Sequence, residues 1–172
     1  EGFSVQGLVG WSLSDAGDIN GDGIDDFIVG VQEGSLGGSL AGQAYVIFGK
    51  VGATRANIDL TTITAADGFI IQGDAAGDRA GFSVSSAGDV NGDGIDDLIV
   101  GAPTGDDGGT DAGEAYVIFG EAGATRANID LTNLAAADGF IIQGDLAGDL
   151  AGFSVSSAGD INGDGIDDLI VG

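Results

Sequence analysis

The chain has 172 residues, of which 28 are acidic and 4 are basic, so its formal net charge is −24. This surplus makes nucleic acids and anionic membrane surfaces unfavourable partners, because both carry the same sign of charge. The sequence has no cysteine for disulfides or thiolate metal sites, no histidine for base catalysis, and no apolar run that could span a bilayer.

Short strands separated by turns are predicted along the chain, which contains 35 glycines. Residues 2–7 (GFSVQG) form the first such run. Residues 81–89 alternate apolar and serine side chains, as a half-buried strand does, and residues 96–103, 113–120 and 139–145 are β-branched or aromatic runs. Between the last two, residues 128–139 predict a short strand and one helical turn that ends at Gly139.

The pattern repeats every 71 residues. Residues 68–101 and 139–172 align without gaps and differ at three positions, 75/146, 79/150 and 90/161. The runs GATRANIDLT and AYVIFG also occur twice, at 52–61 and 123–132 and at 44–49 and 115–120. Four strands per period, with turn residues between them, are typical of a propeller blade. The sequence therefore predicts an all-β fold of four-stranded antiparallel blades in tandem.

The period also divides the chain. Residues 1–10 hold the last strand of a preceding blade, 11–81 and 82–152 are two full repeats, and 153–172 begin a third. The chain thus contains about two and a half blades, whereas closed propellers have roughly four to eight. We expect other chains or further sequence to complete the fold, or the repeats to stack openly. Open strand edges attract further strands, which favours self-association.

One nine-residue string occurs in every repeat: DINGDGIDD at 18–26 (loop 1), DVNGDGIDD at 89–97 (loop 2) and DINGDGIDD at 160–168 (loop 3). Calcium takes six to eight oxygen ligands and tolerates irregular geometry. Side-chain oxygens at positions one, three, five and nine, with the main-chain carbonyl of position seven, would supply five of them. The predicted ligands are Asp18, Asn20, Asp22, Ile24 and Asp26 in loop 1; Asp89, Asn91, Asp93, Ile95 and Asp97 in loop 2; and Asp160, Asn162, Asp164, Ile166 and Asp168 in loop 3.

Other interpretations of the string are weaker. An EF-hand needs a glutamate at position twelve, where all three copies have valine. Asn-Gly and Asp-Gly also favour simple hairpin turns, but four carboxylates in nine positions would repel one another without a cation. Magnesium demands stricter octahedral geometry, and zinc lacks nitrogen and sulfur ligands here. The position-eight aspartates, Asp25, Asp96 and Asp167, are expected to point away from the ion, into solvent or the surrounding shell.

The pattern GFSV…GDVNGDGIDDLIVGAP…GEAYVIFG resembles the FG-GAP repeat of integrin α-subunit β-propellers, and more closely the FG-GAP arrays of bacterial secreted proteins. The resemblance covers nearly the whole chain and implies a propeller with a calcium loop between the first two strands of each blade, hence three ions here. The family has phenylalanine before glycine, whereas this chain has Gly81-Phe82, as the bacterial arrays do, and Trp11 replaces that phenylalanine in the first copy.

Two further features of the sequence could form sites. Residues 105–114 (GDDGGTDAGE) contain enough acidic groups for another cation site, but their counterpart at 33–43 lacks aspartate, which favours a solvated turn. Arg55 and Arg126 occupy identical sequence contexts, so we expect pairing with a neighbouring blade or an acidic loop rather than capture of a ligand.

These features predict a non-enzymatic, calcium-binding structural or adhesive module of an extracellular protein, secreted or at the cell surface and of bacterial type. Its expected partners are calcium, further copies or neighbouring repeats, and a protein or glycan ligand. Two alternatives stay open. One is a self-assembling filament or surface-layer protein, and the other is an accessory propeller of a secreted enzyme.

Overall fold

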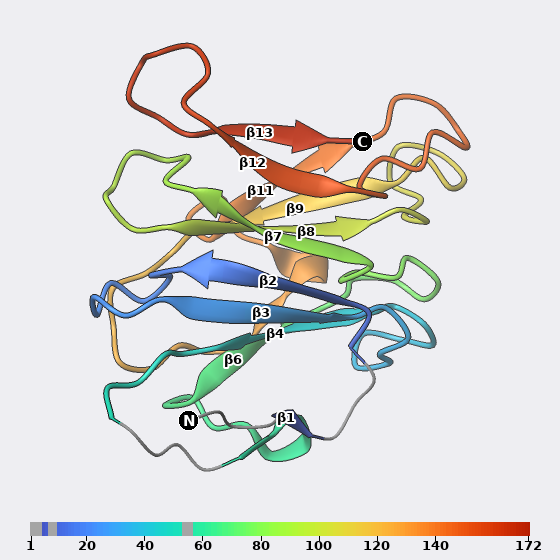
Figure 1. Ribbon diagram of the computed structural model, residues 1–172. Coiled ribbons are helices and arrows are strands. Elements are labelled where there is room, and N and C mark those ends of the chain that lie inside the picture. Colours follow the sequence, from blue (N-terminus) through green and yellow to red (C-terminus); the bar gives the residue numbers. More distant parts are fainter. Residues whose placement is uncertain (1–4, 7–9, 53–56) are drawn as a thin grey trace.

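The computed structural model describes residues 5–6, 10–52 and 57–172 of the chain, which form a stack of antiparallel sheets (Figure 1). The first blade contains β2 (Ser12–Gly17), β3 (Asp26–Val31), β4 (Gln43–Ile47) and β6 (Gly68–Gln72). The second contains β7 (Ser83–Gly88), β8 (Asp97–Ala102), β9 (Glu114–Ile118) and β11 (Gly139–Gln143). The third begins with β12 (Val155–Gly159) and β13 (Asp168–Val171).

Within each blade, neighbouring strands pair in sequence order and run antiparallel. The second blade repeats the register of the first: Ile28 pairs with Val46 in one, and Ile99 pairs with Val117 in the other. The predicted all-β architecture of four-stranded blades in tandem is confirmed, with β12 and β13 as the start of the third.

The blades pack face to face, which explains the continuous apolar runs in their central strands. Every residue of β8 and β9 is buried, because each of these strands lies between two other layers. Ile28, Val46 and Phe69 of the first blade share a core with Tyr116 and Ile118 of the second. On the other side of the second blade, Ile99 and Val117 pack against residues of β12 and β13.

Close approach of the blades depends on glycine at one repeated position. A Cβ atom on Gly30 would lie 2.1 Å from the carbonyl oxygen of Gly81, just before the first strand of the next blade. The equivalent Gly101 would place a Cβ 2.0 Å from the carbonyl oxygen of Gly152. Both distances are far below van der Waals contact, so any side chain here would push neighbouring blades apart.

The segment between the third and fourth strands of a blade reaches back to the preceding blade. The short strand β10 (Ile129–Asp130) pairs in parallel with β6, and β5 (Ile58–Asp59) pairs in the same way with β1 (Val5–Gln6). Each is followed by one 3₁₀ turn, η1 (Leu60–Thr62) or η2 (Leu131–Asn133). The short strand was predicted correctly, but the helical turn ends at Asn133, with Leu134 as its C-cap, rather than at Gly139.

Gly139 instead begins β11. Of the strand expected at 2–7, only Val5–Gln6 is described, and the other positions lie outside the described residues. Neither helical turn in the described part of the chain is long or apolar enough to cross a membrane.

The outer face of the third blade is uncovered. Ile28, Ile99 and Ile170 occupy the same position in successive blades, and their exposed fractions are 0%, 0% and 56%. The same side chain is thus buried wherever another blade follows it and exposed where none does.

Candidate metal centres

The three nine-residue loops lie at the same end of the stack, on the left in Figure 1. Each joins the first two strands of its blade: loop 1 lies between β2 and β3, loop 2 between β7 and β8, and loop 3 between β12 and β13. Each is entered through a β-bulge whose last residue is a glycine with φ between 61° and 72°, namely Gly17, Gly88 or Gly159. The bulge turns the chain out of the ladder and into the loop.

The side chains of each loop are held by backbone N–H groups of the same loop. In loop 1, Asp18 Oδ1 accepts a hydrogen bond from Asp22 N at 2.9 Å and Asp18 Oδ2 accepts one from Gly23 N at 2.8 Å. Asn20 Oδ1 also accepts from Asp22 N, and Asp22 Oδ1 accepts from Ile24 N. The carboxylate and amide oxygens of positions one, three and five therefore line the inside of one curled backbone segment.

Loops 2 and 3 repeat this network. Asp89 and Asp160 accept from the N–H groups four and five residues later, at 2.8–3.1 Å. Asn91 and Asn162 accept hydrogen bonds from the backbone N–H of position five. Asp93 and Asp164 accept hydrogen bonds from the backbone N–H of position seven. The geometry of the loop is thus a property of the nine-residue string rather than of its place in the chain.

The position-nine aspartates tie each loop to its blade. Asp97 Oδ2 accepts from Val90 N at 2.9 Å, and Asp97 Oδ1 accepts from Gly120 N, just after β9, at 2.8 Å. Asp26 Oδ1 similarly accepts from Gly49 N at 2.6 Å. Burial raises the pKa of Asp26 and of Asp97 to about 6; these backbone hydrogen bonds lower each pKa, and the other loop aspartates raise it. In loop 3, Asp168 Oδ2 accepts from Ile161 N.

Within each repeat, the predicted ligand side chains therefore lie in a single loop, but their carboxylates are not tightly clustered. Among the described residues, a single group of three acidic side chains brings its oxygens within 4.8 Å of one another, and none of its members belongs to the three loops. The loop ligand sets stay a prediction, supported by the orientation of their oxygens.

The position-eight aspartates have a role that sequence reasoning missed. Asp96 Oδ2 in loop 2 accepts a hydrogen bond from Asp18 N in loop 1 at 2.8 Å, and Asp167 Oδ2 accepts from Asp89 N at 3.0 Å. They point away from their own loop, but toward the preceding loop rather than into solvent. The signal was present in the sequence, because the Asp-Asp pair recurs with the 71-residue period.

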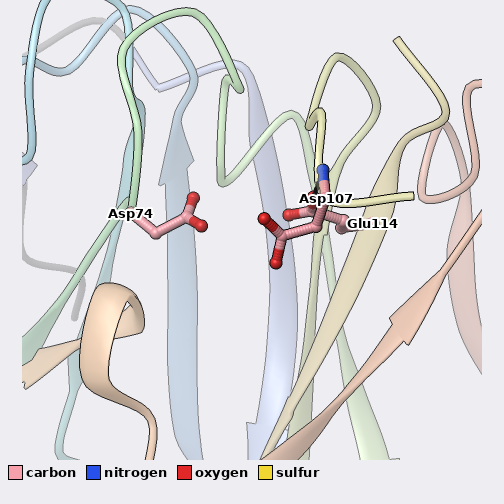
Figure 2. A group of neighbouring side chains, drawn as sticks. All are labelled: Asp74, Asp107 and Glu114. Atoms are coloured by element: carbon pink, nitrogen blue, oxygen red, sulfur yellow. Dashed lines mark hydrogen bonds between the residues drawn. The ribbon is translucent and has the colours of Figure 1, made fainter. Parts of the chain in front are cut away.

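The remaining acidic group lies at the other end of the stack, between the first two blades. Asp74 follows β6, Asp107 lies in the connection between β8 and β9, and Glu114 begins β9 (Figure 2). Glu114 Oε1 accepts from Asp107 N at 2.9 Å, and Glu114 Oε2 accepts from the hydroxyl of Tyr116 at 2.5 Å. The solvated turn predicted for residues 105–114 is wrong at Glu114, which is completely buried. Burial raises the pKa of Glu114.

Arg126 pairs as the sequence predicted. Its guanidinium carbon lies 4.7 Å from the ring centre of Phe69 in the first blade, and its Nε lies 3.9 Å from Glu121 Oε2. Burial lowers the pKa of Arg126, while Glu121 and nearby aspartates raise it. Arg55, the equivalent residue of the first repeat, lies outside the described residues.

Comparison with known proteins agrees with the blade architecture. The FG-GAP repeat family matches residues 10–47 and 80–118. Phosphatidylinositol-glycan-specific phospholipase D of Bos taurus is 33% identical over 167 residues, which covers 95% of this chain and 18% of that protein. Integrin alpha-PS2 of Drosophila melanogaster is 32% identical over 69% of this chain and 8% of its own length, and integrin alpha pat-2 of Caenorhabditis elegans is 31% identical over 96% and 12%.

The chain spans less than a fifth of the length of each of these relatives. The matches to the repeat family fall on the first three strands of the first and second blades, including loops 1 and 2. The chain belongs to the FG-GAP repeat proteins, the repeat type it shares with integrin α subunits.

Proposed function

We propose that this chain is a calcium-stabilised, non-enzymatic structural or adhesive module of an extracellular protein. The observation that carries the proposal is the threefold recurrence of one loop geometry, in which side-chain oxygens of positions one, three and five face the inside of the same curled segment. Each loop would hold one Ca²⁺ ion through these oxygens, the carbonyl of position seven and the carboxylate of position nine.

The buried position-nine carboxylate of loop 1 supports a cation. Asp26 Oδ2 is buried without a hydrogen bond of good geometry, although the Ile19 N–H lies near enough to lower its pKa. The carboxylates of Asp22 and Asp18 raise the pKa of Asp26, so the acidic side chains of the loop repel one another. A divalent ion would turn these repulsions into attraction.

The role of calcium in this proposal is structural. Extracellular calcium modules have dissociation constants of about 10⁻⁴–10⁻³ M. At a tenfold excess of calcium, each site would contribute about 1.4 kcal/mol to the free energy of unfolding. Three sites would contribute about 4 kcal/mol, a large share of the roughly 5–15 kcal/mol that stabilises an ordinary domain.

The experiment counts the ions and measures their effect on stability. Calorimetric titration of the chelated chain with CaCl₂ should reveal the three loop sites, and calcium should raise the melting temperature. Asp93→Asn should remove the loop 2 ion and leave the other loop sites, with Asp130→Asn on the exposed connector as the control. An identical melt in EDTA and in calcium would overturn the proposal.

The relatives support an extracellular placement. Several are integrin alpha subunits, and we propose that this chain likewise belongs to a cell-surface or secreted protein of bacterial type. Its blades would form a surface that binds a protein or glycan ligand. Calcium-dependent adhesion of the purified chain to cells or glycan arrays tests this; equal binding with and without calcium would argue against it.

Two alternatives rest on specific observations. A relative is a phospholipase D, which supports an accessory propeller beside an enzyme domain, and catalytic residues in sequence flanking the chain would test it. The uncovered Ile170 and Phe153 support assembly, because a further repeat or a second copy could cover them. Light scattering with and without calcium distinguishes assembly from a monomeric module.

A further inference from the structure

The second blade holds loop 1 at three consecutive residues. Asp96 Oδ2, in loop 2, accepts a hydrogen bond from the N–H of the first residue of loop 1 at 2.8 Å. The Ile19 carbonyl oxygen accepts a hydrogen bond from Glu121 N at 3.1 Å, and the Asn20 carbonyl oxygen accepts one from Gly123 N at 2.9 Å. All three contacts involve the backbone of loop 1, so they hold its first turn and leave its side-chain oxygens to the proposed calcium ion.

The segment that makes two of these contacts also touches loop 2. Residues 120–123 come shortly after β9 and form a bridge between the two loops. At one end of the bridge, Gly120 N donates to Asp97 Oδ1, the position-nine carboxylate of loop 2, at 2.8 Å. Farther along, Ala122 packs against loop 1, because a Cβ on Gly21 would lie 3.5 Å from the Ala122 Cβ. The bridge therefore contacts both loops.

Loop 1 is more enclosed than loops 2 and 3. Asn20 is 3% exposed, whereas its counterparts Asn91 and Asn162 are exposed. In the described part of the chain, loop 3 forms hydrogen bonds to loop 2 at a single residue: Asp167 Oδ2 accepts from Asp89 N at 3.0 Å, and Asp167 N donates to the Asp89 carbonyl oxygen at 3.2 Å. The following blade thus holds loop 1 at three residues and loop 2 at one.

Both connections start at the end of loop 2 and reach the beginning of loop 1. Ile95 and Asp97 are the proposed ligands at positions seven and nine, and Asp96 lies between them. A calcium ion in loop 2 would fix these three residues, and with them the acceptors of the Asp18 N–H and of the bridge. Loop 1 would then be ordered before its own ion arrives, so binding of that ion would cost less conformational entropy.

We propose that loops 1 and 2 bind calcium cooperatively, with Asp96 and the bridge as the elements that couple them. This inference rests on the proposed calcium binding in the loops and adds that these sites are not independent. Coupling between two binding sites is reciprocal, and it typically changes affinity by about 5- to 150-fold. Loss of the ion from either loop should therefore weaken calcium binding by the other loop at least about fivefold. Loop 3 should be affected less, because it shares fewer hydrogen bonds with loop 2.

The test measures calcium binding by each loop separately. Gly23, Gly94 and Gly165 occupy position six of the three loops, and each donates its N–H to the position-one carboxylate. Their amide signals in proton–nitrogen correlation NMR spectra, recorded while CaCl₂ is added to the chelated chain, should give one midpoint per loop. Asp93→Asn removes a proposed loop 2 ligand whose side chain, among the described contacts, bonds to neither Asp96 nor the bridge. We expect it to raise the loop 1 midpoint at least about fivefold and the loop 3 midpoint by less.

The sign of this change separates coupling from simple electrostatics. Asp93→Asn removes one negative charge together with a doubly charged cation, so loop 2 becomes more negative than in the calcium-loaded parent chain. Charge attraction by itself would then tighten calcium binding in loop 1, whereas the proposed coupling weakens it. Asp22→Asn, the equivalent substitution in loop 1, should weaken calcium binding by loop 2 by the same factor.

A double-mutant cycle assigns the coupling to its contact. In an Asp96→Ala background, Asp93→Asn should shift the loop 1 midpoint by a smaller factor. Asp25→Ala, at the same position of loop 1, is the matched control and should leave that factor unchanged. Dispersed spectra verify that each variant folds. An unchanged or lower loop 1 midpoint in Asp93→Asn, with the loop 2 ion lost, would overturn the coupling and leave the proposed function intact. If the signals of all three loops ignored calcium, both proposals would be wrong.

Discussion

The carboxylate of Asp96 accepts a hydrogen bond from the backbone N–H of Asp18 at 2.8 Å, and these two residues belong to different blades. The same contact recurs between Asp167 and Asp89 at 3.0 Å. The same sequence separation of 78 residues, one repeat plus seven positions, thus links each pair of successive loops. Loops 2 and 3 thus each use their position-eight aspartate to hold the first residue of the loop before them.

Removing this link should loosen the blades. Asp96→Ala deletes a charged acceptor and leaves Asp18 N without its partner, so the free energy of unfolding should fall by about 1–2 kcal/mol. The equivalent Asp25→Ala lies at an exposed position of loop 1 and should change stability by less than about 0.5 kcal/mol. Urea denaturation of both variants in calcium measures the difference, and equal losses would contradict an interblade role for Asp96.

The glycine before each loop makes room for this carboxylate. A Cβ on Gly17 would lie 2.2 Å from Asp96 Oδ2, whereas a Cβ on Gly159 meets nothing within 4 Å. Both glycines have positive φ, 61° and 64°. Gly159→Ala should therefore show only the backbone cost of about 1–2 kcal/mol, and Gly17→Ala should cost distinctly more.

Thermal or urea unfolding of the two glycine variants tests this prediction. Adding Asp96→Ala to Gly17→Ala should recover part of the loss, because it removes the clashing group. If the two glycine variants were equally destabilised, the steric explanation would be wrong.

The buried carboxyls predict an unusual pH dependence in the absence of calcium. The pKa of Asp26 and of Asp97 is raised from 3.8 to about 6, so each binds its proton more tightly in the folded state. The stability from this protonation is complete below about pH 4 and is lost as the pH rises through 6. The chelated chain should therefore unfold more easily at pH 7 than at pH 5.

Saturating calcium should reverse this slope, since protons then compete with the ion for the same carboxylates. Urea denaturation at several pH values, with EDTA or with calcium, measures both slopes. A chelated chain that became less stable below pH 6 would contradict the role given to Asp26 and Asp97.

The uncovered face of the third blade should drive association. Ile170→Ser should weaken any concentration-dependent oligomer, because it removes an apolar side chain whose counterparts Ile28 and Ile99 are fully buried between blades. Leu146→Ser is a suitable control, since Leu146 is also exposed but lies in the connection after β11. Sedimentation velocity measures both, and equal weakening would point to general hydrophobicity instead of the blade face.

Much of the fold could be predicted because the sequence repeat corresponds to one structural unit, the blade. The 71-residue period and the short apolar runs identified the strands, and the resemblance to FG-GAP repeats implied the loop between the first two strands of each blade. These are local properties: alternation, turn residues and ligand spacing depend on residues close in sequence. The helical turn after β10 was placed too late, because Gly139 serves the start of β11 rather than the end of a helix.

The acidic junction could not be predicted in the same way. Asp107 and Glu114 were visible in one segment, but Asp74 lies 33 residues before Asp107 and joins them only when two blades pack. The repeat gave a contrary signal, since the corresponding segment at 33–43 contains no aspartate. Burial of Glu114 depends on the neighbouring blade, which no local pattern encodes.

The sequence by itself determined the blade, its period and the geometry of the nine-residue loops, because strand alternation and loop hydrogen bonds involve residues a few positions apart. Only the tertiary structure decided how the blades meet. It directed Asp96 to Asp18 across 78 residues, buried Glu114 beside Asp74 and left Ile170 uncovered. The physical reason is that face-to-face packing sets burial and brings distant carboxylates together.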